Sequence, residues 1–487
     1  MAPSPDSGGG RIYAYVWFDV EDNMTPETND PPLQAIRILK KYRVPVTYKL
    51  IAEKVRFLKE EKRQDVISAM DDYCDIGYHT DSHSRHPVVY EYIKGMNVLR
   101  GSKEIEKREQ RGLDELKSTF RRIPSCFGHA GSQWAPHYYP YMKRVGIPVY
   151  MDSTDVLNLD DSPYWYCGVL NLTNATKNIV RFDRTFETRN GNIKLKKRLR
   201  RIHDRLRSTG GGAISILWHP HTAIDKVYWD IPNFANGKNT PKERYVQPRQ
   251  QPSEVKRRAL KDFESLIKFA SSFKDVRFIS ATESRRIYLR RIEMVLGPTE
   301  IRKIAQMLAK SNEISYFWLG SEYISPSQSF CALVNFAASF ARTGAIPQNI
   351  KMNEPLGPMS RFESKLVEDT KLVLSDFLAA AEDVSRFIGK KGCLPSSVRI
   401  NGSVELGPSD FLATLAVLCL QLIRGKPFGK YVQLRRARMI LEEKFIDARA
   451  FERACRWPIL PQGFSAPGIL DQAKLQTWTL VPAIPRV

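Results

Sequence analysis

The sequence predicts an α/β domain followed by a mainly helical domain. Two observations predict the α/β domain. Apolar, β-branched segments alternate with helical segments from Arg11 to about Leu296, and polar residues cluster where several of the apolar segments end. Alternating units of this kind build a parallel sheet or barrel, whose functional groups collect at the C-terminal ends of the strands. Gly297-Pro298 marks the predicted boundary, because the chain beyond it becomes helical and repetitive.

The elements of the first domain follow from hydrophobic periodicity and from proline, glycine and asparagine signals. Ile12–Phe18 is an apolar run that ends in acids, which indicates a buried strand. Pro31-Pro32 opens a helix, since proline is tolerated in a first turn. Asn190-Gly191 has the form of a hairpin turn between two short strands. The other predicted strands are 46–50, 75–79, 125–128, 148–151, 213–217 and 276–279, and the predicted helices are 33–42, 53–72, 103–120, 138–145, 195–207, 254–273 and 284–294.

The predicted domains are a disordered tail at 1–10, the α/β domain at 11–296 and a helical domain at 297–487. The helical domain contains repeats at about 324–358, 372–408 and 409–434, each a helix followed by a short extended segment. The first two finish with the same pattern, Gly344–Pro347 and Gly392–Pro395. Such units are expected to stack, either to bind a partner or to cap the first domain.

The charge of the chain is strongly positive. Lys and Arg number 75 against 53 Asp and Glu, which gives a net charge of +22. Such a field attracts anions, whether phosphates, acidic glycans or lipid headgroups. The basic stretch Lys194–Arg207 has apolar residues at helical spacing, which favours an amphipathic helix of the first domain. We therefore do not expect a nucleic-acid partner.

The cysteines and the N-terminus bear on the compartment. The 7 cysteines are odd in number and form no C-x-x-C pair, which argues against a disulfide framework and a zinc–thiolate site. Residues 1–10 contain no apolar stretch typical of a secretory signal. The longest apolar run, Phe411–Ile423, is too short for a transmembrane segment, which needs about 20 residues. A cytoplasmic protein is expected, with an extracellular location requiring an unrecognised route.

The histidines point to the chemistry. The chain has 8 histidines, and all lie at or before His221. His79 and His83 stand four apart after a predicted strand, and the acids Asp19, Glu21 and Asp22 end the first strand. Imidazoles with one carboxylate are typical ligands of a catalytic metal, because they leave positions open for water. The alternative is that the acids are a solvated loop cluster. We interpret this part of the chain as a metal hydrolase.

His219 is a further candidate, because it ends the apolar strand Ala213–Leu217 and should project at the same rim. An imidazole there can protonate a departing amine.

These residues together resemble the polysaccharide deacetylase family (carbohydrate esterase family 4) over about residues 11–290. His79-Thr80-Asp81-Ser82-His83 matches the family motif His-[Ser/Thr]-x-x-His, and Leu217-Trp218-His219 matches Leu-x-His. The resemblance implies a distorted (β/α) barrel with His79 and His83 as metal ligands. It implies Asp19 as the catalytic base, Glu21 or Asp22 as the third ligand, and His219 as the acid, with Trp218 in support.

One family motif is missing. The family's Arg-x-Pro-x-Gly, whose arginine holds the base, is replaced by Cys126–Ser132, which has neither Arg nor Pro. His129 is a candidate positive partner for Asp19 instead. The loss leaves sugar specificity open, because members acting on other amides also diverge there.

The repeats of the second domain resemble pseudomurein-binding repeats, which carry Gly-x-Leu-Pro-x-x-Val-x-[Ile/Val]-Asn-Gly. Gly392–Gly402 fits this pattern well and Gly344–Asn353 fits in part. The resemblance implies that the repeats bind an archaeal cell-wall glycan.

The predicted function is removal of N-acetyl groups from a GlcNAc-type sugar or glycan by a metal-dependent hydrolase. One divalent transition metal is expected, zinc first, with cobalt, nickel or iron as alternatives. Two other hypotheses remain. One is a hydrolase of the same superfamily acting on a C–N bond of a small cyclic amide or ureide. The other is a non-catalytic protein that binds glycans or anions through its basic charge.

Overall fold

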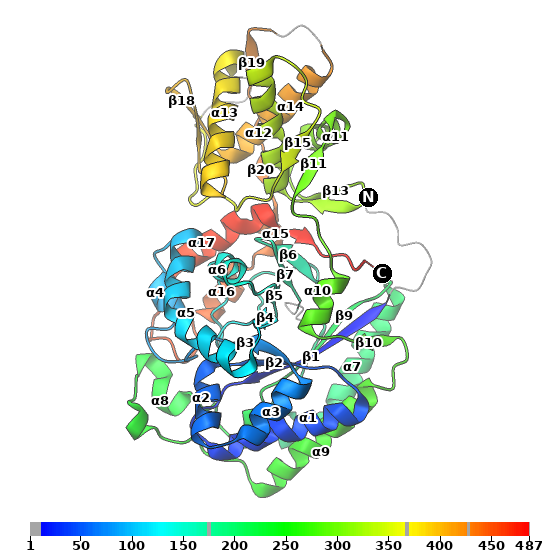
Figure 1. Ribbon diagram of the computed structural model, residues 1–487, viewed down its shortest axis with the longest axis vertical. Helices are drawn as coiled ribbons and strands as arrows, with labels where there is room; N and C mark the ends of the chain where they lie inside the picture. The colour runs from blue at the N-terminus through cyan, green and yellow to red at the C-terminus, as the bar shows by residue number, and fades with distance from the viewer. Residues whose placement is uncertain (1–10, 173–176, 366–369, 426–428, 487) are drawn as a thin grey trace.

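The computed structural model describes residues 11–172, 177–365, 370–425 and 429–486 (Figure 1). The chain forms a lower lobe built on one curled sheet and an upper lobe of helices with short ribbons. The tail predicted at 1–10 lies outside the described residues.

The lower lobe is the predicted α/β barrel. Its sheet has the strand order β21-β6-β7-β5-β4-β3-β2-β1-β9-β8, and β10 also pairs with β1. All pairs from β5 through β8 are parallel, whereas β6 and β21 are added in antiparallel fashion. The sheet is a distorted barrel, because β1 pairs with β10 at its start and with β2 at its end. The strands are β1 (Ile12–Val20), β2 (Thr47–Leu50), β3 (Asp75–Tyr78), β4 (Cys126–Phe127), β5 (Val149–Tyr150), β6 (Tyr164–Tyr166), β7 (Val169–Asn171), β8 (Ile179–Arg181), β9 (Gly212–Trp218), β10 (Val276–Phe278) and β21 (Val481–Pro482).

Helices cover the outside of this sheet. Every residue of β1 is buried, because helices pack on one face of the strand and other core residues on the opposite face. The lobe's helices are α1 (Asp30–Tyr42), α2 (Ala52–Glu60), α3 (Gln64–Tyr73), α4 (Val89–Ile93), α5 (Val98–Phe120), α6 (Tyr138–Val145), α7 (Gly191–Ser208), α8 (Ile231–Phe234), α9 (Ser253–Ala270) and α10 (Ala281–Ile287).

Two local predictions in this lobe are wrong. The hairpin at Asn190-Gly191 does not form, because Gly191 begins the helix α7. A Cβ on Gly191 would stand 1.7 Å from the carbonyl oxygen of Thr185, so the glycine is required by close backbone contact and not by a turn. The single helix predicted at 53–72 is two helices, α2 and α3, separated by a turn in which Lys62 has a positive φ.

The upper lobe contains the predicted helix-and-extended units. α12 is followed by β15, α13 by β17 and α14 by β19, and the three helices pack against one another. The lobe's elements are β11 (Met294–Leu296), α11 (Pro298–Ala309), β12 (Glu313–Ile314), β13 (Phe317–Leu319), β14 (Glu322–Ile324), α12 (Pro326–Thr343), β15 (Ile350–Met352), β16 (Lys371–Val373), α13 (Leu374–Lys391), β17 (Val398–Ile400), β18 (Val404–Leu406), α14 (Pro408–Ile423), β19 (Tyr431–Gln433) and β20 (Arg438–Met439).

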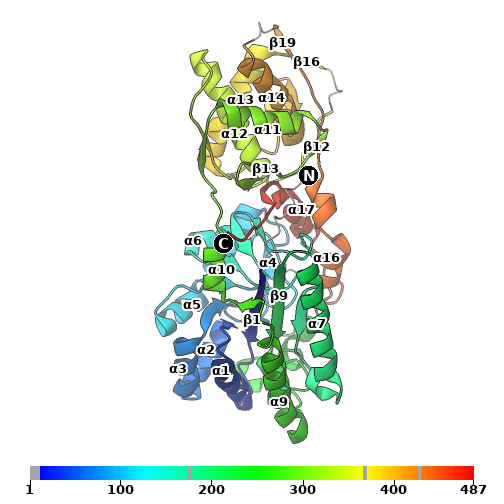
Figure 2. The same cartoon turned by 90° about the vertical axis from the view of Figure 1, so that its right-hand side faces the viewer.

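The end of the chain returns to the lower lobe. After β20 it forms α15 (Leu441–Phe445), α16 (Ala448–Ala454) and α17 (Pro467–Gln476), which lie beside the barrel in both views (Figure 2). β21 then pairs with β6 at the edge of the barrel sheet. Residues 441–486 therefore pack against the barrel, although the boundary predicted at 297 places them in the second domain.

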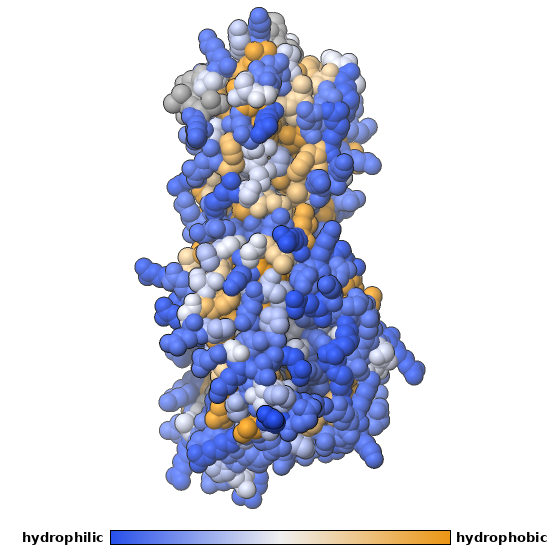
Figure 3. Space-filling view, turned by 90° about the vertical axis from the view of Figure 1, so that its left-hand side faces the viewer, coloured by the Kyte–Doolittle hydropathy of each residue, from blue (hydrophilic) through white to orange (hydrophobic). Residues whose placement is uncertain are grey.

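The surface differs between the two lobes. In the face shown in Figure 3 the lower lobe is mostly hydrophilic, whereas apolar residues are more frequent over the upper lobe. Among the described helices, none combines the length and apolar character needed to cross a membrane.

Candidate metal centre and active site

A buried lysine organises the end of the first strand. Asp19 on β1 stands in register with Lys49 on β2. The Lys49 ammonium lies 2.8 Å from Asp19 Oδ1 and 2.6 Å from Asp152 Oδ2, and all three side chains are buried. Burial alone would raise the pKa of Asp19, but Lys49 and the neighbouring imidazoles lower it below its usual range. Asp19 is therefore a carboxylate held in place by a cation.

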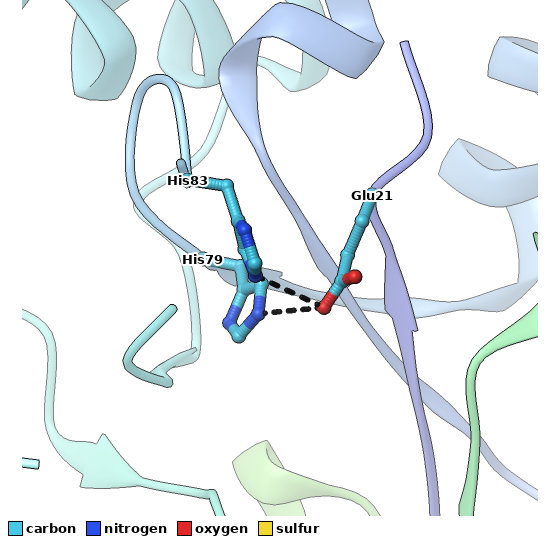
Figure 4. A group of neighbouring side chains, drawn as sticks. All are labelled: Glu21, His79 and His83. Atoms are coloured by element: carbon cyan, nitrogen blue, oxygen red, sulfur yellow. Dashed lines mark hydrogen bonds and ion pairs between the residues drawn. The ribbon is translucent and has the colours of Figure 1, made fainter. Parts of the chain in front are cut away.

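Glu21, His79 and His83 converge on one point (Figure 4). Glu21 Oε1 lies 3.1 Å from His79 Nε2 and 3.4 Å from His83 Nε2. The glutamate follows β1 and the histidines follow β3, so neighbouring parallel strands deliver them to the same edge of the sheet. All three side chains are at most 4% exposed, so their charge is screened little by water.

The hydrogen bonds of the two imidazoles fit a metal ion. His79 Nδ1 donates to the carbonyl of Gly128. His83 Nδ1 donates to Ser84 Oγ, which itself donates to Asp230. With Nδ1 as the donor, His79 presents an Nε2 lone pair to the Glu21 carboxylate, a contact that a metal ion between the two groups would satisfy. His83 Nε2 faces the same carboxylate and also accepts from the Gly131 backbone N–H at 3.2 Å.

The spacing of the three ligand atoms also fits. Ligands about 2.1 Å from one zinc ion stand about 3 to 4 Å apart. Glu21, His79 and His83 each offer one ligand atom, and these atoms lie within 4.8 Å of one another.

Asp22 faces a different environment from Glu21. Its Oδ1 accepts hydrogen bonds from the backbone of Met24 and Thr25. Burial, and then the neighbouring carboxyl of Asp225, raise the pKa of Asp22 to about 6. Among the described residues, two of the three groupings able to share one ion include Glu21, and none includes Asp22. Glu21 Oε2 accepts from Trp229 Nε1 at 3.1 Å, which fixes the orientation of the carboxylate.

His219 is held as an imidazolium beside Asp19. Its Nδ1 and its backbone N–H both donate to Asp183, each at 2.8 Å. Burial alone would lower the pKa of His219, but the Asp183 carboxylate raises it well above its usual value. The opposite ring nitrogen, Nε2, lies 3.4 Å from Asp19 Oδ2 and 3.7 Å from Glu21 Oε1.

The two supporting residues do not occupy the predicted roles. The cation that pairs with Asp19 is Lys49, whereas His129 Nδ1 contacts the Tyr150 hydroxyl. Burial lowers the pKa of His129 to about 4, so its ring is neutral at neutral pH. Trp218 is fully buried and packs against Phe18 and Phe182 in the core. Side-chain alternation explains this, since Trp218 points to the opposite face of β9 from Leu217.

These groups form the floor of a pocket of about 840 Å³. Asp19, Glu21, His79, His83 and His219 all line it. One wall comes from the returning end of the chain, where Ala450, Arg453 and Trp457 line the same pocket. The Trp457 ring packs edge-on against the His83 ring, with 5.7 Å between ring centroids. The pocket is therefore shared between the barrel strands and residues more than 200 positions later.

Several residues of the site were not predicted. Asp152 and Asp183 follow β5 and β8, so the rule that found Asp19 and His219, polar groups at strand ends, would also have found them. Lys49 could also have been predicted, because it is a single cation within an apolar strand. Nothing in the sequence around Trp457 indicates that it reaches the pocket.

Comparisons with known proteins give only distant likenesses. No family model matches the chain, and no curated protein sequence matches it. The pseudomurein-binding resemblance of the repeats thus receives no support, and the glycan partner it implies stays a prediction.

Solved structures align with part of this chain at 13–14% identity. A Mycobacterium smegmatis protein assigned as a polysaccharide deacetylase aligns over 59% of this chain and 93% of its own, with a TM-score of 0.39. Puue allantoinase aligns over 57% and 91%, with a TM-score of 0.38. A Pseudomonas aeruginosa protein assigned as a polysaccharide deacetylase aligns over 57% and 92%, also at 0.38. At this distance the likeness carries no argument about activity, which rests on the geometry of the site.

Proposed function

We propose that this protein is a metal-dependent hydrolase that removes N-acetyl groups from a GlcNAc-type sugar or glycan. One observation carries the proposal: Glu21 Oε1 and the Nε2 atoms of His79 and His83 converge at the floor of an open pocket. Glu21, His79 and His83 would hold one divalent transition metal, with zinc favoured by the imidazole and carboxylate set. Such an ion supplies a water of lowered pKa and polarises the acyl carbonyl.

The other groups of the floor act on protons. Asp19 is ionised, and its Oδ2 accepts the proton of the attacking water. Lys49 makes Asp19 a weak base, which is sufficient for a water that is already acidic. His219 carries a proton on Nε2 and donates it to the departing amine, while Asp183 stabilises the imidazolium.

The pocket wall orients the sugar. Trp457 and Tyr228 present aromatic rings beside His83 and His219, and such rings pack against the apolar face of a pyranose. The pocket volume of about 840 Å³ is sufficient for more than one sugar ring.

The direct test is release of acetate from N-acetylated chitooligosaccharides by protein loaded with Zn²⁺, Co²⁺ or Ni²⁺, with the bound metal measured by elemental analysis. We expect about one metal per chain. His79→Ala should no longer bind the metal, and its kcat/KM should fall by more than about 100-fold. Loss of a metal ligand should lower metal affinity and activity more than loss of a group that only orients a ligand. His86→Asn is the matched control, since His86 contacts Glu91 and Phe234 outside this pocket.

Different results would favour the other hypotheses. Hydrolysis of cyclic amides or ureides, with no acetate released from any sugar, would identify a C–N hydrolase of another specificity. Purified protein that takes up no stoichiometric metal would contradict the proposal and leave a glycan- or anion-binding protein.

A further inference from the structure

Basic side chains surround the mouth of the pocket. Arg181, Arg184 and Lys226 line it on the barrel side, and Arg453 lines it on the wall formed by α16. The Arg181 and Arg453 side chains are 49% and 59% exposed, and Arg184 is 30% exposed. A single exposed carboxylate, Asp155, lies among the residues that line this pocket. The rim therefore has a clear excess of positive charge.

The acids of the pocket lie deeper than its cations. Asp19, Glu21 and Asp152 are at most 5% exposed, and each already faces Lys49 or the two histidines. The negative charge at the floor of the pocket is therefore already paired with neighbouring positive or imidazole groups. A ligand entering the pocket meets the rim first, where the positive charge is accessible to solvent.

The rim arginines differ in how firmly they are held. Arg453 stands 3.9 Å from Asp447 in an exposed pair, which contributes little to stability, so its guanidinium can turn to a bound anion at little cost. Arg181 stands 3.9 Å from the buried Asp183, and Arg184 donates to Glu187 and to the Lys226 carbonyl. A guanidinium has five N–H donors, so these two side chains can keep their partners and still bind a carboxylate or phosphate.

The basic surface continues beyond the pocket. A second hollow of about 410 Å³ lies next to it and shares Arg184 with it. Lys194, Arg198 and Arg201 of α7 line that hollow. α7 and α16 lie on the same side of the molecule (Figure 2). Arg184 thus joins the catalytic pocket to a basic helix face long enough for several sugar units.

We infer that the substrate is an anionic N-acetylated glycan. Its acidic group, a carboxylate or a phosphate, is bound at the rim by Arg181, Arg184 and Lys226 on one side and by Arg453 on the other. The chain of the glycan continues along α7. This inference rests on the proposed function for the chemistry at the floor, but the anion site is defined by separate residues.

The experiment compares matched neutral and anionic sugars on the zinc-loaded protein. Chitotetraose is compared with a tetrasaccharide of alternating GlcNAc and glucuronate, and GlcNAc with GlcNAc 1-phosphate. Binding is measured by calorimetry and turnover by acetate release. We expect about 10-fold tighter binding in at least one anionic series at low salt, and loss of most of that preference at about 0.5 M salt.

Two variants locate the site. Arg184→Gln and, on the opposite wall, Arg453→Gln should each lower the ratio of anionic to neutral sugar binding by about fivefold. Lys103→Gln removes an equal charge from an exposed position of α5 and should not change this ratio. Equal binding of neutral and anionic sugars, or rim variants that behave like Lys103→Gln, would overturn the inference.

The two proposals fail separately. If no sugar releases acetate but anionic sugars bind preferentially through Arg184 and Arg453, the proposed function is wrong and the anion site stands. If neutral sugars are bound and deacetylated as well as their anionic counterparts in both series, the deacetylase stands and the anion site is wrong.

Discussion

Lys49 holds together two buried carboxylates of the candidate site. It is fully buried between Asp19 and Asp152, and its ammonium also lies 4.4 Å from the centroid of the Trp17 ring. Two buried carboxylates this close would repel each other without the ammonium between them. Lys49 is therefore the positive partner of Asp19, the role that was predicted for His129.

Lys49→Met should lower the free energy of unfolding by about 3–5 kcal/mol, because it removes the buried ammonium that Asp19 and Asp152 share. Adding Asp152→Asn should recover part of the loss, since one of the two charges is removed. Urea denaturation measures both effects. Lys59→Met, which breaks an exposed pair with Glu115, should cost less than about 1 kcal/mol. A Lys49→Met protein as stable as its parent would contradict this account.

Glu109 gives a pH-dependent prediction away from the catalytic groups. Burial raises the pKa of Glu109 to about 7, and its Oε2 accepts from the Tyr78 hydroxyl and from the backbone of Asp81. A folded-state pKa above the unfolded value means that the folded protein binds the proton more tightly. The stability is therefore full at low pH and falls as the pH rises through about 7.

Glu109→Gln, which is neutral at every pH, should remove this dependence. Relative to the parent, the variant should gain on the order of 2 kcal/mol in stability between pH 5 and pH 8. Thermal unfolding of both proteins at the two pH values measures the gain. An unchanged difference in Tm would show that Glu109 is ionised in the folded protein throughout this range.

At the scale of single residues, the sequence predicted those site residues that are acids or histidines at the ends of strands. These are Asp19, Glu21, His79, His83 and His219, and the structure brings all five to one pocket. The sequence did not predict whether Glu21 or Asp22 faces the histidines, because this depends on how the chain twists after β1. The rotation of one residue decides which carboxylate faces the histidines and which faces Asp225.

At the scale of elements, the error at Gly191 shows how one residue type supports two interpretations. Asn-Gly predicts a hairpin when only neighbouring residues are considered. The structure uses the same glycine at the start of α7, where the carbonyl of Thr185 leaves no space for a side chain. Contacts of this kind are made between segments, so short-range patterns do not contain them.

Two glycine substitutions should have opposite effects. Gly191→Ala should destabilise the protein by more than about 1 kcal/mol, because the added Cβ would overlap the Thr185 carbonyl oxygen. Gly389→Ala, in an exposed part of α13 with no atom within 4 Å of the new Cβ, should stabilise it by about 0.5–1 kcal/mol. Urea unfolding of the two variants checks both signs. Equal effects would mean that helix propensity alone governs both sites.

At the scale of the whole molecule, the parallel core was predictable and the path of the chain end was not. Strand and helix alternation predicted β1 to β5, β9 and β10, because each of these segments carries its own periodicity, but β6 and β7 were missed. The return of residues 441–482 to the barrel depends on β21 pairing with β6 and on the burial of Val481. These contacts join segments about 300 residues apart, beyond the range of a local pattern.

This arrangement predicts that the barrel does not fold well without the end of the chain. A fragment of residues 11–296 should be poorly soluble, because it lacks one pocket wall and exposes the apolar surface that Val481 covers. A fragment in which residues 441–486 are joined to it by a flexible linker should be a soluble monomer. Gel filtration and circular dichroism measure both. Equal behaviour of the two fragments would show that the barrel is autonomous.

The position of Trp457 has a consequence for biosynthesis. Trp457 is synthesised long after His79 and His83, so these histidines emerge from the ribosome before the pocket wall that covers them. A nascent chain can therefore present its histidines and carboxylates to solvent before the pocket is closed around them. Closure of the pocket must await synthesis of the segment around Trp457.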